Sequence, residues 1–237
     1  MLGHTDIAID LGTSTVLAYI KGRGIVLREP AMAAVDTNTR NIIAVGDEAR
    51  RMQGRTPLNI KVVRPLRDGS VMDFDVTERM LRYFIHKIVG RRALSRPYAV
   101  VCVPSSVTDM EKRSIIEATL DAGARRAQLM DSAVAGALGA GLEVDQAYGS
   151  LLVDIGGGVT DISVVAMERA VVRTVAHAAG DTFDDTIMRF LRKKHNLMVG
   201  ERTAEEVKVT IGSAMRRTEQ LFMDVSGRNM VTGLPKT

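Results

Sequence analysis

Two short turns in the sequence combine glycine, hydroxyl side chains and an acidic residue in the same order. Residues 10–15 read Asp-Leu-Gly-Thr-Ser-Thr, and residues 154–160 read Asp-Ile-Gly-Gly-Gly-Val-Thr. Turns of small residues expose several backbone N–H groups on one side, and such a nest binds anions like phosphate. Hydroxyl groups in the first turn add donors, from Thr13, Ser14 and Thr15. The pattern therefore predicts a pair of phosphate-binding turns.

An aspartate precedes the glycine in both turns, at Asp10 and Asp154. A carboxylate there would repel phosphate directly. It suits a hydrated Mg²⁺ instead, because this ion keeps several waters and takes one or two carboxylates plus phosphate oxygens. The alternative is a pair of ordinary tight β-hairpins, which does not explain an acidic residue at the end of an apolar strand both times.

The elements around the turns repeat as well. Apolar runs predict strands at residues 7–9, 16–20 and 25–27, and the pattern returns at residues 151–153, 162–165 and 171–172. Each set is a β-meander and not the strand–helix alternation of a Rossmann domain. This internal repeat predicts two matching halves that meet at a pseudo-twofold cleft, with the second half shorter than the first.

Helical periodicity and capping patterns predict the remaining elements. Helices are expected at 76–89, from 108 to about 123, and at 133–141, 183–191 and 204–214, with further strands at 98–103 and 129–130. Three N-caps are predicted, namely Asp75 with Glu78, Thr108 with Glu111, and Thr203 with Glu206. The fold class is therefore α/β.

Composition restricts the function classes. The chain has 237 residues, 46% of them hydrophobic, a net charge of +4, no Trp and only 4% aromatic residues. Because its charges are spread out and stacking platforms are few, we expect no binding to nucleic acid. Cys102, the only cysteine, is expected to be a small buried residue in a strand, so no disulfide can form within the chain. We expect a cytoplasmic protein, because the sequence also lacks a signal peptide and an apolar run long enough to span a membrane.

Further segments carry a family resemblance. They are residues 24–30 (Gly-Ile-Val-Leu-Arg-Glu-Pro), 54–57 (Gly-Arg-Thr-Pro), 64–69 (Arg-Pro-Leu-Arg-Asp-Gly), 73–81 (Asp-Phe-Asp-Val-Thr-Glu-Arg-Met-Leu) and 200–205 (Gly-Glu-Arg-Thr-Ala-Glu). With the two turns, they resemble the MreB family of rod-shape-determining bacterial actins, within the superfamily of actin, DnaK-type chaperones and sugar kinases. The resemblance runs from about Asp6 to Pro235.

The resemblance implies an actin-like, two-lobed ATPase fold with duplicated mixed-sheet halves. The first lobe would span residues 1–145, with a small subdomain at about 33–65. The partial second lobe would span 146–237, with its inner sheet to about 179 and a small helical subdomain at about 180–237. The resemblance also implies ATP and Mg as ligands. The phosphates would lie on Gly12, Thr13, Ser14, Thr15, Gly156, Gly157, Gly158 and Val159, and one adenosine wall would be Glu205, Glu206, Val207 and Lys208. From the residues alone, these four positions are instead read as a solvated helix start, where the macrodipole favours acidic residues.

The chain departs from the family pattern in three respects. The family continues past Pro235, so the second lobe is expected to be incomplete. The family's water-polarising Glu is replaced by Ser132 and its Thr beside the γ-phosphate by Val159, which predicts very slow ATP turnover and leaves the catalytic residues unknown. Residues 91–96, Arg-Arg-Ala-Leu-Ser-Arg, are either a weak electrostatic contact with an anionic membrane surface or a solvated loop.

The resemblance implies a structural function. The expected protein binds MgATP and forms or joins membrane-associated filaments that guide the cell-wall elongation machinery, by self-association or by co-assembly with a full-length MreB paralogue. Two alternatives are open: a degenerate, truncated paralogue acting as a non-hydrolysing interaction partner, and a small ATPase or kinase of the same superfamily. The ATPase or kinase alternative is weakened by Ser132 and Val159, and by the absence of a recognisable motif for a second substrate.

Overall fold

The computed structural model describes residues 6–67, 70–90, 96–104 and 107–237. The chain divides into two compact units, Met1–Ala176 and His177–Thr237, which are described separately below. The predicted membrane-contact segment at 91–95 and the end of the 64–69 motif lie outside the described residues. The lobe and subdomain boundaries derived from the resemblance stay predictions.

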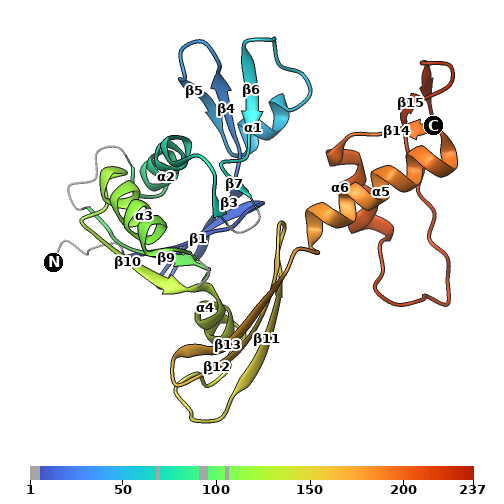
Figure 1. The fold of residues 1–237 in the computed structure, drawn as a ribbon. Helices are drawn as coiled ribbons and strands as arrows, with labels where there is room; N and C mark the ends of the chain where they lie inside the picture. Colours follow the sequence, from blue (N-terminus) through green and yellow to red (C-terminus); the bar gives the residue numbers. More distant parts are fainter. Residues whose placement is uncertain (1–5, 68–69, 91–95, 105–106) are drawn as a thin grey trace. The chain divides into compact units, whose positions relative to one another are not determined.

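The first unit is built on a five-stranded sheet in the order β10-β9-β1-β2-β3 (Figure 1). The strands β1 (Ile7–Leu11), β2 (Thr15–Ile20) and β3 (Gly24–Pro30) form the predicted antiparallel meander. On the other side of β1, β9 (Tyr98–Val103) and β10 (Arg126–Asp131) continue the sheet in parallel. Parallel addition requires crossover connections, and helices supply them here.

Two helices bury the apolar face of this sheet. They are α2 (Phe74–Val89) and α3 (Asp109–Asp121), and they share one apolar cluster with β1, β2 and β9. The fully buried members include Phe84, Met80 and Leu81 from α2. The capping box of α3 is confirmed, because Thr108 accepts from the Glu111 amide and the Glu111 carboxylate accepts from Thr108.

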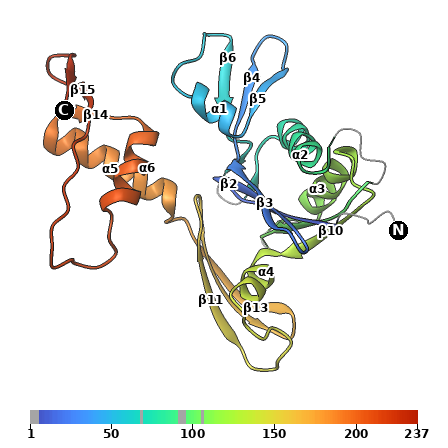
Figure 2. The same ribbon diagram turned by 180° about the vertical axis from the view of Figure 1, so that it is seen from behind.

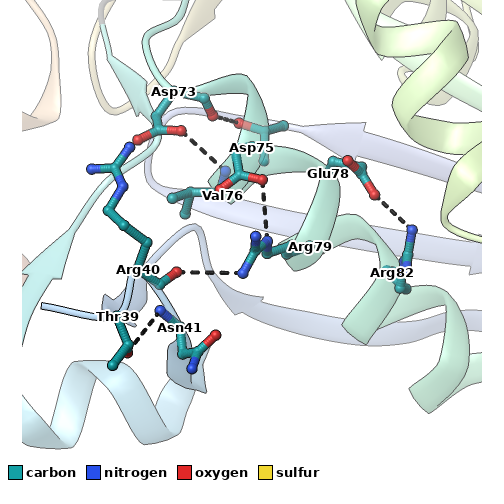
Figure 3. A network of polar contacts seen from close by, with 10 residues as sticks. Thr39, Arg40, Asn41, Asp73, Asp75, Val76, Glu78, Arg79 and Arg82 are labelled. Carbon is teal, nitrogen blue, oxygen red and sulfur yellow. Dashed lines mark hydrogen bonds and ion pairs between the residues drawn. The ribbon is translucent and has the colours of Figure 1, made fainter. Parts of the chain in front are cut away.

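The predicted N-cap of α2 is wrong. The cap is Asp73, whose Oδ1 accepts from the Val76 amide at 3.1 Å, while its own backbone is extended (Figure 3). Asp75 is therefore inside the first turn, where its carboxylate pairs with Arg79 at 3.2 Å. Glu78 pairs with Arg82 at 2.7 Å instead of closing a capping box. Two aspartates two residues apart can both act as an N-cap, and here Asp73 is the one whose side chain accepts the capping hydrogen bond.

A small sheet follows β3. It contains β4 (Ala33–Asp36), β5 (Ile42–Val45) and β6 (Ile60–Val63) in the order β5-β4-β6, with the short helix α1 (Asp47–Met52) beside it (Figures 1 and 2). The buried carboxylate of Glu29 accepts from the Asp47 amide at the start of α1 and pairs with Lys87 of α2. This residue ties the small sheet to the larger one. The hairpin of β7 (Leu66–Arg67) and β8 (Ser70–Val71) leads into α2.

The second predicted meander is also present. The strands β11 (Ser150–Ile155), β12 (Thr160–Ala166) and β13 (Arg169–Ala176) form a three-stranded antiparallel sheet in that order. The small-residue helix α4 (Ser132–Gly139) packs on one face of it, with Ala133, Val134 and Ala137 against apolar side chains that include Leu152 and Val165.

The second unit pairs α5 (Gly180–His195) with α6 (Glu201–Ile211). A small sheet of β14 (Leu197–Met198), β15 (Gly227–Asn229) and β16 (Pro235–Lys236) accompanies them. The predicted capping box of Thr203 and Glu206 is wrong, because α6 begins three residues earlier than expected and both residues lie inside it. Its N-cap is Gly200, which has no side chain to accept a hydrogen bond.

Candidate functional site

The first glycine turn joins β1 to β2. The Gly12 amide donates to the Thr15 carbonyl at 3.2 Å, which closes the turn. A Cβ atom at Gly12 would lie 2.8 Å from that carbonyl oxygen, so the tight closure requires glycine. The Ser14 carbonyl accepts from the Ala31 amide just beyond β3, and Thr13 is buried. The hydrogen bond from Ala31 and the burial of Thr13 therefore fix the turn against the sheet.

The second glycine turn joins β11 to β12 with the same closure. The Gly156 amide donates to the Val159 carbonyl at 3.0 Å, and a Cβ atom at Gly156 would lie 3.0 Å from the same oxygen. Gly158 is buried and Val159 is half-buried. Residues far apart in the sequence thus form two turns of one type, as the internal repeat predicts.

The two turns lie against each other within the first unit. A Cβ atom at Gly157 would lie 2.0 Å from Ser14 Oγ and 2.7 Å from Ser14 Cβ. Real Cβ atoms do not approach other atoms so closely, so only glycine allows the turns to meet. The structure brings together the phosphate residues predicted from the first turn and those predicted from the second.

The two aspartates predicted to hold a metal ion, Asp10 and Asp154, interact electrostatically. Desolvation by the surrounding protein raises the pKa of Asp10, and the like charge of Asp154 raises it further. The Asp10 side chain still has solvent-exposed surface, so its desolvation is partial. A carboxylate whose ionised form is destabilised by a second, nearby carboxylate suits a divalent cation between the two. This donor set fits a hydrated Mg²⁺.

The thiol of Cys102 lies near Asp10 and is affected by the same negative charge. Cys102 is the residue opposite Asp10 on the parallel strand β9. Burial, followed by the negative charges of Asp10 and Asp131, raises the pKa of Cys102 to about 11. The thiol is therefore protonated at neutral pH and is a poor nucleophile.

A third acidic residue near the second turn was missed in the sequence. Asp161 of β12 lies directly opposite Asp154 of β11, so the two side chains share one face of the sheet. Asp161 is buried, and its carboxylate accepts from Ser163 Oγ at 2.5 Å and pairs with Arg173 of β13. The available signal was an acid that interrupts an apolar strand at an inward-facing position.

The two positions at which the chain departs from the family's hydrolytic residues, Ser132 and Val159, lie in different elements. Ser132 is the first residue of α4, directly after β10. The adjacent Asp131 caps this helix, with its Oδ1 accepting from the Ala133 amide at 2.9 Å. Val159 brings an aliphatic side chain to the second turn. Neither Ser132 nor Val159 supplies a carboxylate that could polarise a water.

The predicted adenosine wall belongs to the other unit. Glu205, Glu206, Val207 and Lys208 lie on α6. Lys208 Nζ donates to Asp184 Oδ2 at 2.8 Å and to the Gly180 carbonyl at 3.1 Å, both on α5. Burial raises the pKa of Asp184, and Lys208 opposes this rise. Lys208 thus joins the two helices, and its placement relative to the glycine turns stays a prediction.

The part of the chain that the structure describes contains neither a metal-binding cluster nor a membrane-spanning helix. Within those residues, no group of three or more His, Cys, Asp or Glu side chains is arranged to hold a metal ion. No helix among them is both long and apolar enough to cross a bilayer. A cation at the glycine turns would therefore depend on two carboxylates and on oxygens from its ligand.

Comparison with known proteins agrees with this geometry. Residues 4–237 match the family described as MreB/Mbl protein. The cell shape-determining protein Mbl of Bacillus subtilis is 44% identical over 232 residues, which cover 98% of this chain and 70% of Mbl. The cell shape-determining protein MreB of Escherichia coli K12 is 42% identical, over 98% of this chain and 68% of MreB.

A solved structure shows the same fold. The crystal structure of MreB5 of Spiroplasma citri bound to AMPPNP superposes with a TM-score of 0.89 at 34% identity, covering 98% of this chain and 70% of that protein. The fold is actin-like, as the two meanders and their glycine turns indicate, and the chain spans about 70% of the relatives' length. The chain belongs to the MreB/Mbl family.

Proposed function

We propose that this protein binds MgATP at the two glycine turns and that the bound nucleotide controls its assembly into filaments. The observation that carries the proposal is the contact between the turns, where Gly157 and Ser14 leave no room for a side chain. Two nests of backbone N–H groups that close on each other can hold the phosphates of one nucleotide from both sides. A pair of unrelated hairpins has no need for such an approach.

In this proposal each residue has a distinct role. Backbone amides of Gly157 and Gly158 and the hydroxyls of the first turn bind phosphate oxygens, while the amide of Gly12 keeps the first turn closed. Asp10 and Asp154 hold the waters of a Mg²⁺ ion, which, when bound, neutralises part of the phosphate charge. By the family resemblance, the residues assigned to the adenosine are Glu205–Lys208 of α6. MreB5 of Spiroplasma citri, crystallised with AMPPNP, supports a nucleotide at this family's site.

Hydrolysis is expected to be slow. A positioned general base accelerates such reactions by about 10²–10⁴-fold, and Ser132 cannot act as one at neutral pH. Val159 cannot hold a water beside the γ-phosphate. We therefore assign the protein a structural function in which nucleotide occupancy matters more than turnover.

The cellular function follows from the relatives, which are cell shape-determining proteins. Filaments formed with itself or with a full-length MreB paralogue would act in the cytoplasm at the inner membrane face and guide cell-wall synthesis. The family membership supports this assignment. No part of it depends on a separate catalytic substrate.

Calorimetric titration of the purified chain with ATP and Mg²⁺ tests the nucleotide proposal. We expect a dissociation constant in the micromolar range, which corresponds to about −8 kcal/mol. The same titration with Gly157→Ala should lose most of the heat, whereas Gly139→Ala, where a Cβ atom meets no atom within 4 Å, should keep it. A folded protein that binds no nucleotide would reject the proposal and favour the degenerate interaction partner.

Filament formation is tested by sedimentation. The chain, alone or mixed with a full-length MreB/Mbl relative, is centrifuged with ATP, with AMPPNP and without nucleotide. We expect more protein in the pellet with either nucleotide. Equal sedimentation in all three conditions would separate nucleotide binding from assembly.

A further inference from the structure

The carboxylate of Glu29 lies where three elements of the first unit meet. Glu29 is near the end of β3, and its side chain is buried. Its Oε2 accepts a hydrogen bond from the Asp47 amide, at the start of α1, at 3.3 Å. Its Oε1 accepts one from Lys87 Nζ, near the end of α2. The two oxygens of one side chain therefore hold two different elements.

The surroundings of Glu29 are apolar, so its charge depends on these partners. Val16, the residue opposite Glu29 on β2, is fully buried, and Leu27 on β3 belongs to the same apolar cluster. A buried carboxylate that loses its cation is strongly destabilising. Lys87 supplies the cation, and its hydrogen bond to Glu29 raises the pKa of Lys87. The Lys87 side chain is half-exposed, so water can compete for it.

Gly46, the residue before α1, makes room for the carboxylate. Its φ of 65° is in the left-handed region that favours glycine. A Cβ atom at Gly46 would overlap Glu29 Oε2 and lie 3.2 Å from Glu29 Cβ. Gly54, which follows α1, also has a positive φ, of 74°, but a Cβ atom there would meet no atom within 4 Å. Gly46 is therefore needed for the approach of Glu29 as well as for its own backbone conformation.

The small sheet has a second attachment to α2, at the opposite end of that helix. Ala33 of β4 packs with Val76 in an apolar cluster. Arg79 Nη1 donates to the Arg40 carbonyl at 3.3 Å (Figure 3). Lys87 is about 16 Å further along the helix axis than Val76. One attachment is thus apolar and the other is polar and partly open to solvent.

We propose that Glu29 is a latch that fixes the small sheet on the larger one, and that opening it lets the small sheet and α1 turn about the apolar contact at Val76. The latch is closed while Glu29 accepts from the Asp47 amide, and Lys87 positions the carboxylate for that bond. The chain passes between the two sheets at residues 30–33 and 63–66, which serve as the hinge. The inference holds whether or not the glycine turns bind nucleotide.

Two measurements test the latch. In a Cys102→Ala background, spin labels are placed at Leu58→Cys, in the loop before β6, and at Met110→Cys, at the start of α3. Both side chains are highly exposed, at 106% and 79%. Double electron–electron resonance gives the distribution of distances between the labels. Hydrogen exchange of the Asp47 amide is followed by NMR in the same variants without labels.

The variants separate the latch from general damage. Glu29→Ala removes it, and Gly46→Ala displaces the carboxylate without changing any charge. We expect both to broaden the distance distribution and to speed exchange at Asp47 by at least about tenfold. Gly54→Ala, which has a positive φ without the collision, and Glu78→Gln, which removes the acid of an exposed ion pair on α2, should change neither measurement.

A double variant identifies the cause. Gly46→Ala should add less in a Glu29→Ala background, because the atom with which it collides is gone. If Glu29→Ala does not fold, Lys87→Ala, at a half-exposed site, replaces it with the same expected result. Unchanged distances and exchange in the folded variants overturn the proposal. Equal broadening in Gly54→Ala, or a broad distribution in the unsubstituted chain, also overturns it.

Discussion

The two glycine turns are closed by the same backbone hydrogen bond, yet they stand on very different supports. The first rises from a five-stranded sheet whose strand β1 is buried by α2 and α3. The second rises from a three-stranded sheet with one apolar face open. Turn geometry is therefore set locally by glycine, whereas the rigidity behind each turn depends on segments distant in the sequence. The predictions below compare the halves, from the largest effect to the smallest.

Matched isoleucine truncations should separate the halves most clearly. Ile9→Ala removes a fully buried side chain, and we expect a loss of about 2–5 kcal/mol in the free energy of unfolding. Ile155→Ala removes a side chain that is 63% exposed, and we expect less than about 0.5 kcal/mol. Urea unfolding followed by circular dichroism measures both. Equal losses would mean that Ile155 is buried in solution.

Restoring a general base should reveal whether the second turn otherwise supports ATP hydrolysis. Ser132→Glu places a carboxylate in the first turn of α4, where the helix dipole favours it. We expect phosphate release from MgATP to rise by about 10²-fold, with a further gain on adding Val159→Thr. Ser132→Gln is the control without a base. A rate that is already high in the unsubstituted chain would contradict the assigned slow turnover.

Gly157→Ala tests the contact between the turns. The new Cβ atom would collide with Ser14, so the turns must separate, and we expect at least about a tenfold loss of MgATP affinity, or 1.4 kcal/mol. Gly12→Ala should weaken binding to a similar degree through its own carbonyl clash. Calorimetric titration of both variants compares the turns directly. Full affinity in Gly157→Ala would show that the contact is dispensable.

Asp10→Asn should have the smallest effect of the four changes, and the direction in which it shifts the melting temperature is informative. The pKa of Asp10 is raised in the folded state, so its ionised form destabilises the fold above that pKa, and this cost disappears below the unfolded value of 3.8. The melting temperature of the ligand-free variant should therefore exceed that of the unsubstituted chain at pH 7, and the difference should shrink toward pH 4. Addition of MgATP should reverse the order. A variant that is less stable at pH 7 without ligand would contradict this assignment.

Local patterns predicted much of the fold. The strand at 98–103 has the bounds of β9, and the capping box at Thr108 and Glu111 is present. Both signals depend on neighbours within a few residues. The repeat was visible for the same reason, because each turn carries its own glycines.

Features that depend on distant partners were missed. Asp161 interrupts an apolar strand, which was a local signal, but its partner Arg173 lies on the next strand and no sequence window shows their ion pair. The apolar residues of β11 predicted a strand, but a sequence window does not show whether a helix covers them. The start of α6 was placed too late because its N-cap, Gly200, lacks the side chain by which caps are recognised.

The contact between Ser14 and Gly157 also constrains how the protein folds. It closes a loop of about 140 residues, so the loss of chain entropy on closure is large and must be offset by structure formed in between. During synthesis β10 emerges from the ribosome before residue 157 does, so the first sheet can assemble before the two turns meet. The paired turns are therefore among the last features of the first unit to form. Only chains in which the two turns have met would bind nucleotide, so nucleotide binding would select the fully folded protein.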